Sequence, residues 1–310
     1  MKAGGKLGKF EVALSGMRLE PPIMNASGVL GLASSSLVMV AEAGVGAVVT
    51  KSIGLEPRAG NPNPTVVEAP CGLLNSMGLP NPGVENFRVE LEEALPRIGK
   101  PLIVSVFGFR PEEYGKVIRR IDDLPVAGFE LNVSCPHVGE VGTELGSKPE
   151  NIRRVVEEAK AATEKPVFIK LSPNVSDFAG LAKVAEEAGA DGITAINTVR
   201  AMAIDIEAGR PILAGVFGGL SGPAIKPVAL RCVYEAYETV GIPIIGCGGI
   251  SSWTDAVEFF MAGASAIQVG TAIAYHGLEV FRRIVKGLAS YLEEHGFKSL
   301  RELVGFAHRR

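Results

Sequence analysis

Short apolar runs alternate along the chain with segments of helical periodicity. Because the glycine of an Ala-Gly pair takes the left-handed conformation that ends a helix, each run after such a pair is expected to be a strand. The same expectation holds for runs that begin directly after a proline. Runs after a proline lie at residues 102–104, 167–169 and 244–245. Runs after an Ala-Gly pair lie at residues 47–49, 193–195 and 266–269.

The segments between these runs predict helices with one apolar face. Residues 152–159 place apolar side chains at i, i+3, i+4 and i+7 behind a Ser147-x-x-Glu150 pattern typical of a capping box, and residues 181–188 repeat the spacing. With two further strands at residues 23–24 and 128–131, the count reaches eight strand-helix units. Strands that are apolar throughout favour a parallel sheet covered by helices. Eight units favour a closed (β/α)₈ barrel over an open doubly wound sheet.

Two connections are longer than a compact barrel needs, at residues 53–83 and 199–226. Both follow strands, so they are expected on the C-terminal face, where barrel enzymes hold their active sites. Residues 10–19 predict a β-hairpin that closes the opposite end of the barrel. We expect residues 1–310 to form a single domain.

Composition and charge exclude several classes of protein. The chain has 310 residues, of which 47% are hydrophobic and 21% charged, and its net charge is -3 without a long run of one sign. No nucleic-acid surface is therefore expected. The start lacks an apolar signal region, and no stretch reaches the ~18 apolar residues of a membrane span. Four scattered cysteines without a C-x-x-C pair predict no metal site and a cytoplasmic location.

Polar residues and glycines end the predicted strands and would converge at the mouth of a closed barrel. Taken singly, the amides could cap turns and the lysines could reach solvent. Together they favour a site for a polar, anionic, planar ligand. Glycines after the last two strands favour a phosphate, and hence a cofactor such as FMN. The strand ends are Asn25 with Ser27, Lys51 with Ser52, Ser105, Asn132, Lys170, Asn197 with Thr198, Gly248 with Gly249, and Gly270 with Thr271.

Several motifs together resemble the dihydroorotate dehydrogenases, in order and over nearly the whole chain. The resemblance implies an FMN-binding barrel that oxidises dihydroorotate to orotate in pyrimidine (UMP) biosynthesis. The motifs are Asn25-Ala-Ser-Gly28, Thr50-Lys-Ser52, Leu74-Asn-Ser-Met-Gly-Leu-Pro-Asn-Pro-Gly83, Asn132-Val-Ser-Cys-Pro136, Ile169-Lys-Leu171, Asn197-Thr198, Gly218-Gly-Leu-Ser-Gly222 and Gly248-Gly-Ile250.

The resemblance also indicates a subdivision of that family. The membrane-bound class carries an N-terminal helical extension and a serine base, whereas this chain starts at the barrel and has Cys135, as in the soluble class 1. Residues 204–211 and 219–227 resemble the NAD-linked type, in which electrons leave through a separate iron-sulfur and FAD subunit. A homodimer of this chain is expected as well. The competing acceptor is fumarate, which would enter the same site and need no second subunit.

Roles for individual residues follow from the same resemblance. Cys135 would be the general base, and its thiol has a reference pKa of about 8.5. Lys51 would lie between flavin and substrate, and Lys170 would stabilise negative charge on the reduced flavin. The implied FMN-binding residues are Ser27, Lys51, Ser52, Asn132, Lys170, Ile196, Gly222, Gly248, Gly249, Gly270 and Thr271. The implied substrate-binding residues are Lys51, Asn75, Ser76, Met77, Gly78, Leu79, Asn132, Asn197 and Thr198.

Two alternatives remain open at this point. The first is the related dihydropyrimidine dehydrogenases, which reduce uracil and thymine and in which Cys135-Pro136-His137 also occurs. Separately, Ser105 departs from the family pattern, because many relatives have an asparagine that touches the flavin at this position. A barrel that binds phosphate ligands without redox chemistry is the other alternative, because fold by itself does not establish function.

Overall fold

Eight parallel strands form a closed barrel, as the alternating pattern predicts. The computed structural model describes residues 8–133 and 145–309. The strands neighbour one another in the order β3-β16-β15-β10-β9-β8-β7-β4. The prediction of a (β/α)₈ barrel is confirmed. The barrel strands are β3 (Ile23–Asn25), β4 (Val48–Val49), β7 (Leu102–Val106), β8 (Gly128–Asn132), β9 (Val167–Leu171), β10 (Gly192–Ala195), β15 (Ile244–Cys247) and β16 (Ala266–Val269).

The side chain of Asn25 closes the seam between β3 and β4. These two strands share only an isolated bridge between Met24 and Ala47. The Asn25 carboxamide extends the pairing, because its Oδ1 accepts from the Val49 N–H at 2.8 Å and its Nδ2 donates to the Val49 carbonyl at 2.7 Å. Asn25 is fully buried, so these bonds are not exchanged with water. Asn25 therefore helps to close the wall of the barrel.

Helices cover the outside of the barrel and return the chain to the next strand. The glycines Gly44, Gly189 and Gly263 that follow α1, α6 and α8 have φ values of 92°, 98° and 117°, which confirms the predicted left-handed turns. The helices are α1 (Ser34–Ala41), α2 (Val84–Ile98), α3 (Pro111–Arg119), α5 (Pro149–Lys160), α6 (Phe178–Glu187), α7 (Lys226–Thr239), α8 (Trp253–Met261), α9 (Ala272–His276) and α10 (Glu279–Glu294), with 3₁₀ turns η1 (Pro223–Ile225), η2 (Leu300–Glu302) and η3 (Phe306–His308).

The predicted capping box before α5 is wrong. The helix begins at Pro149 and its N-cap is Lys148, whereas Ser147 belongs to a preceding helical turn. Proline at the first helical position has a suitable φ and lacks the N–H that would need a cap, so it starts the helix without a serine. The predicted apolar face is confirmed, because all four of its side chains are fully buried: Ile152, Val155, Val156 and Ala159.

A β-hairpin closes the N-terminal end of the barrel. Strands β1 (Val12–Leu14) and β2 (Met17–Leu19) pair in antiparallel fashion. Leu14 and Leu19 are fully buried in a cluster with apolar side chains from the starts of the barrel strands. The Ser15 hydroxyl donates to the carbonyl of Asp191 at 2.6 Å, just before β10. The predicted hairpin and its place are both confirmed.

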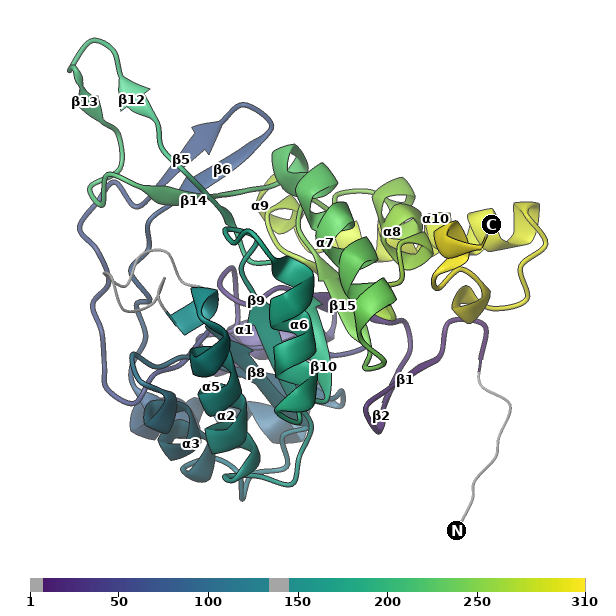
Figure 1. Cartoon of the computed structure of the whole chain (residues 1–310), viewed down its shortest axis with the longest axis horizontal. Coiled ribbons are helices and arrows are strands. Elements are labelled where there is room, and N and C mark those ends of the chain that lie inside the picture. The colour runs from purple at the N-terminus through teal and green to yellow at the C-terminus, as the bar shows by residue number, and fades with distance from the viewer. Residues whose placement is uncertain (1–7, 134–144, 310) are drawn as a thin grey trace.

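The two long connections build a second sheet on the C-terminal side of the barrel, which the sequence pattern did not predict. This antiparallel sheet has the order β11-β14-β6-β5, with β5 and β6 from the first connection and β11 and β14 from the second. A hairpin of β12 and β13 protrudes beyond it (Figure 1). The strands are β5 (Val66–Ala69), β6 (Gly72–Asn75), β11 (Val199–Ala201), β12 (Ile204–Asp205), β13 (Arg210–Pro211) and β14 (Gly218–Ser221).

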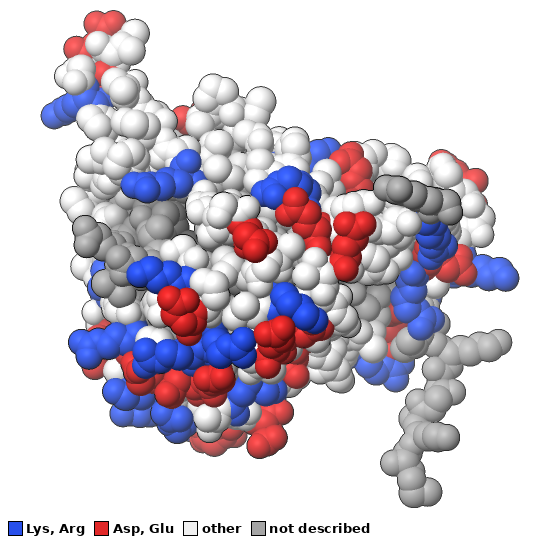
Figure 2. Space-filling model, in the orientation of Figure 1, with Lys and Arg blue, Asp and Glu red and all other residues white. Residues whose placement is uncertain are grey.

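Charged side chains are unevenly distributed over the face seen in Figure 2. Lys and Arg alternate with Asp and Glu over the lower part of this face. Ion pairs of the outer helices include Arg88 with Asp123 and Arg154 with Glu112. The upper part of this face is mostly uncharged. Neither sign dominates an extended area of the face. Among the described residues, no helix is both long and apolar enough to cross a bilayer.

We expect Asn25→Ala to lower the free energy of unfolding by roughly 2–5 kcal/mol, because it leaves a buried N–H and a buried carbonyl of Val49 without partners. Urea unfolding followed by circular dichroism measures the change. Asn86→Ala is the control, since that exposed side chain makes one bond to the Pro82 carbonyl. An equal loss in both variants would contradict the role of Asn25 in closing the barrel.

Candidate active site

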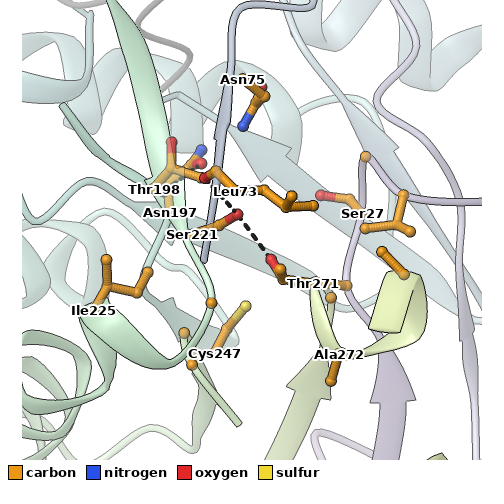
Figure 3. A pocket seen from close by; sticks show the side chains of 18 of the residues that line it. Ser27, Leu73, Asn75, Asn197, Thr198, Ser221, Ile225, Cys247, Thr271 and Ala272 are labelled. Atoms are coloured by element: carbon orange, nitrogen blue, oxygen red, sulfur yellow. Dashed lines mark hydrogen bonds between the residues drawn. The ribbon is translucent and has the colours of Figure 1, made fainter. Parts of the chain in front are cut away.

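A cavity of about 420 Å³ opens at the C-terminal end of the barrel strands. Its floor and walls come from the ends of β4, β8, β9, β10, β15 and β16, and Leu73 and Asn75 of β6 cover it from the second sheet. Figure 3 shows Asn75 entering from the side opposite Cys247 and Thr271. The long connections therefore lie where sequence reasoning placed functional loops.

A chain of hydrogen-bonded polar side chains runs along one side of the cavity. The Asn132 Nδ2 donates to the Ser52 hydroxyl at 2.9 Å, and the Asn197 Nδ2 donates to the Asn132 Oδ1 at 3.1 Å. The Asn197 Oδ1 accepts from the Thr198 N–H at 2.8 Å. Ser52 also shares a hydrogen bond of 2.9 Å with the hydroxyl of Ser105, which is fully buried behind it. Each amide is thereby held in one orientation.

Lys51 brings a positive charge to the same side of the cavity. Its Nζ donates to the carbonyl of Gly28 at 3.1 Å, which holds the ammonium group at the cavity wall. Across the cavity, the Asn75 Nδ2 donates to the Gly219 carbonyl at 3.1 Å and so ties β6 to β14. A cation and fixed amides provide the partners that a carboxylate on a planar ring requires.

The opposite wall is made of backbone. Gly249 has a φ of 80°, and an added Cβ would lie 2.8 Å from the Lys226 backbone nitrogen and 2.9 Å from the Gly222 carbonyl oxygen, so only glycine fits. Within the described part of the chain, the N–H groups of Gly249 and Ile250 make no hydrogen bond. Free N–H groups beside glycines are suited to a phosphate.

Hydroxyl groups complete this backbone wall. The Thr271 hydroxyl donates to the Ser221 Oγ at 2.7 Å, and Ser221 in turn donates to the Leu73 carbonyl at 3.3 Å (Figure 3). These bonds join the end of β16 to the second sheet. The two hydroxyls consequently have fixed positions in the cavity lining.

A lysine and a thiol lie at the floor of the cavity. Burial lowers the pKa of Lys170, but Cys247 and Glu130 raise it, and the net pKa is above its ordinary value. Burial raises the pKa of the Cys247 thiol, against the opposing effect of Lys170. Cys247 and Glu130 are therefore the two described neighbours whose charge acts on the buried Lys170.

Most residues predicted for the site lie together around this cavity. Ser76 does not, because its side chain is buried and accepts a hydrogen bond of 3.1 Å from the Asn61 amide. Cys135 lies outside the described residues. The predicted residues that line the cavity are Ser27, Lys51, Ser52, Asn75, Met77, Gly78, Leu79, Asn132, Lys170, Ile196, Asn197, Thr198, Gly222, Gly248, Gly249, Gly270 and Thr271.

Sequence reasoning missed several contributors to the site. Cys247 and Ser221 line the cavity, and Glu130 and Gln268 lie buried within the barrel next to Lys170. A charged Glu130 within an otherwise apolar strand was the available signal, because a buried carboxylate needs a partner. Asn25 was placed at the mouth from its position in the sequence, but it pairs with Val49 instead.

The fold and this cavity define a (β/α)₈ barrel of the enzyme type, with its site at the C-terminal ends of the strands. A family model described as dihydroorotate dehydrogenase matches residues 9–292. The chain belongs to the dihydroorotate dehydrogenase family.

Curated relatives agree with this family assignment along the full length. A protein of Pyrococcus furiosus is 52% identical over 97% of this chain and 99% of its own length. Proteins of Methanothermobacter thermautotrophicus and Methanosarcina mazei are 48% and 46% identical, over 96% and 99% of this chain and 98% of their own length in each case. All three are named dihydroorotate dehydrogenase B (NAD(+)), catalytic subunit.

The thiols should differ in reactivity according to their surroundings. Burial raises the pKa of Cys232 to about 11, and burial also raises that of Cys247, whereas Cys71 is exposed. At pH 8 we expect a thiol reagent to modify Cys71 faster than Cys232 or Cys247 by roughly 10-fold or more, because each unit of raised pKa removes nine-tenths of the thiolate. Peptide mass spectrometry over time measures this. Equal rates for Cys71 and Cys247 would contradict a raised pKa of the Cys247 thiol.

Proposed function

We propose that this chain is the catalytic subunit of an NAD-linked dihydroorotate dehydrogenase, which oxidises dihydroorotate to orotate with FMN in pyrimidine biosynthesis. One observation carries the proposal beyond family membership. A single cavity joins a cationic, amide-rich side around Lys51 to a backbone wall around Gly249, above the buried Lys170. Such a cavity suits a phosphate-bearing planar cofactor beside a planar anionic substrate.

The residues present fit FMN, one per chain. The free N–H groups of Gly249 and Ile250 support a phosphate at the backbone wall, together with Gly222, Gly270 and the Thr271 hydroxyl. On the polar side, Lys51, Ser52, Asn132 and Lys170 would hold the ring, with Ser27, Ile196 and Gly248 beside them. When bound, the flavin supplies an acceptor for hydride.

The substrate would be held between the polar chain and the second sheet. Lys51 would pair with the carboxylate, while Asn75, Asn132 and Asn197 donate and accept at the ring, and Thr198 adds a hydroxyl. Met77, Gly78 and Leu79 would add contacts from the loop after β6. Ser76 supports that loop through Asn61 rather than facing the cavity. Fixed donors of this kind orient a ligand without a rearrangement at the moment of reaction.

Cys135 is proposed as the general base. Its role comes from the resemblance, and Asn132 three residues before it lines the cavity. Cys135 would take the proton from C5 of dihydroorotate as hydride leaves C6, so that the two hydrogens of the oxidation depart separately. The relatives' names favour this substrate over the uracil- and thymine-reducing alternative.

The proposal includes a partner for electron transfer. The relatives are named catalytic subunits, which implies another subunit, and we propose that it carries an iron-sulfur cluster and FAD and passes electrons to NAD. We further propose a homodimer of this chain at the core of the assembly and a single domain over residues 1–310. The described cysteines are free thiols, which suits a reducing cytoplasm.

Cys135→Ala should retain FMN and orotate binding but reduce its flavin roughly 10²–10⁴-fold more slowly with dihydroorotate, which is the contribution expected of a general base. Stopped-flow single-turnover absorbance measures the rate, and the visible spectrum reports FMN and orotate binding. Cys71→Ala is the control, because Cys71 is exposed and outside the cavity lining. Wild-type reduction rates in Cys135→Ala would remove Cys135 from the mechanism, and a colourless wild-type protein would favour a non-redox barrel.

The purified chain by itself should turn over dihydroorotate with an artificial dye but not with NAD. The reason is that the relatives are named catalytic subunits, which supports a separate subunit that passes the electrons on to NAD. Steady-state assays with dye, NAD and fumarate compare the acceptors under the same conditions. Efficient fumarate turnover would overturn the NAD-linked assignment, and direct NAD turnover would show that no partner is needed.

A further inference from the structure

Four polar side chains meet inside the barrel beneath the cavity, one from each of four strands. They are Glu130 of β8, Lys170 of β9, Thr194 of β10 and Gln268 of β16. Glu130 and Lys170 are 1% and 4% exposed, so both charges are removed from water. Only Lys170 of the four lines the cavity. The other three therefore lie behind it and reach a ligand only through it.

Hydrogen-bond chemistry fixes how these groups are connected. An ammonium group only donates and a carboxylate only accepts, so the amide between them can be oriented in one way. The Lys170 Nζ donates to the Gln268 Oε1 at 3.0 Å, and the Gln268 Nε2 donates to the Glu130 Oε2 at 2.6 Å. Thr194 donates to the same carboxylate oxygen at 3.0 Å. Gln268 thus links the two charged groups.

The second carboxylate oxygen of Glu130 is turned toward Lys170. It lies 3.9 Å from the Lys170 Nζ and accepts no hydrogen bond from a described residue, although it is buried. A buried carboxylate oxygen without such a bond is costly unless a positive charge compensates it. From β15, two strands away, Cys247 is another described titratable group that acts on Lys170, and burial raises the pKa of its thiol, which favours the neutral form. Glu130 is therefore the carboxylate that faces Lys170 inside the barrel.

We propose that Glu130 is a positioning residue, which holds Lys170 in place and in its ammonium form at the floor of the cavity, where it would face a bound flavin. The link to the flavin rests on the proposed function, whereas the pairing of Glu130 with Lys170 does not. The carboxylate offsets the cost of burying the ammonium group, and the Gln268 amide sets its direction. Lys170 then offers a constant positive charge to a reduced flavin over the working pH range.

Replacing the carboxylate by a neutral amide should release the proton of Lys170. In Glu130→Gln, desolvation acts without the opposing charge, and we expect the pKa of Lys170 to fall by about 1–3 units. The control is Glu186→Gln, which neutralises a carboxylate paired with Lys183 at 2.8 Å on the outer helix α6. Glu130→Asp keeps the charge and should retain the wild-type pKa of Lys170.

The first measurement is an NMR titration of isotopically labelled lysine side chains, with the Lys170 signal assigned by its loss in Lys170→Met. It uses the protein with or without flavin and therefore does not depend on the proposed function. We expect a lowered pKa of Lys170 in Glu130→Gln. The pKa of Lys170 should keep its wild-type value in both Glu186→Gln and Glu130→Asp. An unchanged pKa in Glu130→Gln would overturn the proposal.

The second measurement is the flavin reduction potential by dye equilibration between about pH 6 and pH 10, the range in which a lysine with a lowered pKa titrates. In Glu130→Gln the potential should fall below wild type as the pH rises through the new pKa of Lys170, because the reduced flavin loses the positive charge of Lys170. Lys170→Met should remove that pH-dependent fall. If the wild-type protein binds no flavin, the proposed function fails and the NMR titration alone decides the role of Glu130.

A folding defect in Glu130→Gln would still be informative. The double variant Glu130→Gln/Lys170→Met removes both charges together, and replacing a whole buried pair is tolerated far better than breaking it. A folded double variant beside an unfolded single one would support the pairing of Glu130 with Lys170. Failure of both to fold would show that Glu130 serves packing, and would overturn the proposal.

Discussion

Closure of the barrel is the constraint on which the rest of the structure depends. The carboxyl ends of eight strands meet only if β3 and β4 are joined, and these strands are too short to pair extensively. Asn25 supplies the missing pair of hydrogen bonds with its side chain. Once the seam is joined, Lys51, Asn132, Asn197 and the glycine loops face one space, because parallel strands deliver all their ends to the same side.

Closure of the barrel also creates a buried interior in which an unpaired charge costs free energy. A charged side chain there therefore needs a partner of opposite charge. Lys170 and Glu130 lie almost fully buried inside the barrel, between the hairpin plug at one end and the cavity at the other. Their arrangement differs from the surface ion pairs of the outer helices, which are screened and contribute little to stability. A buried pair is retained at a cost, which is reasonable where a fixed positive charge is required by a ligand.

The second sheet converts an open barrel mouth into an enclosed site. Its strands come from two connections that are more than a hundred residues apart, and Asn75 joins them through the Gly219 carbonyl. Thr271 and Ser221 join the sheet to the last barrel strand. The depth of the cavity and the positions of Leu73 and Asn75 are therefore properties of the long connections rather than of the barrel itself.

Local pattern determined much of this protein. The eight strands, the glycine turns after helices and the plug hairpin follow from periodicity and from backbone preferences that act over a few residues, and the motifs at strand ends identified the family. Pairing between distant segments decided the remainder. Asn25 and Asn197 are the same residue type at equivalent strand ends, yet one completes the wall and the other lines the cavity. The second sheet and the contact of Glu130 with Lys170 likewise depend on which strands become neighbours. No local signal encodes those neighbours, because the free energy that selects them comes from burial and hydrogen bonding across the whole barrel.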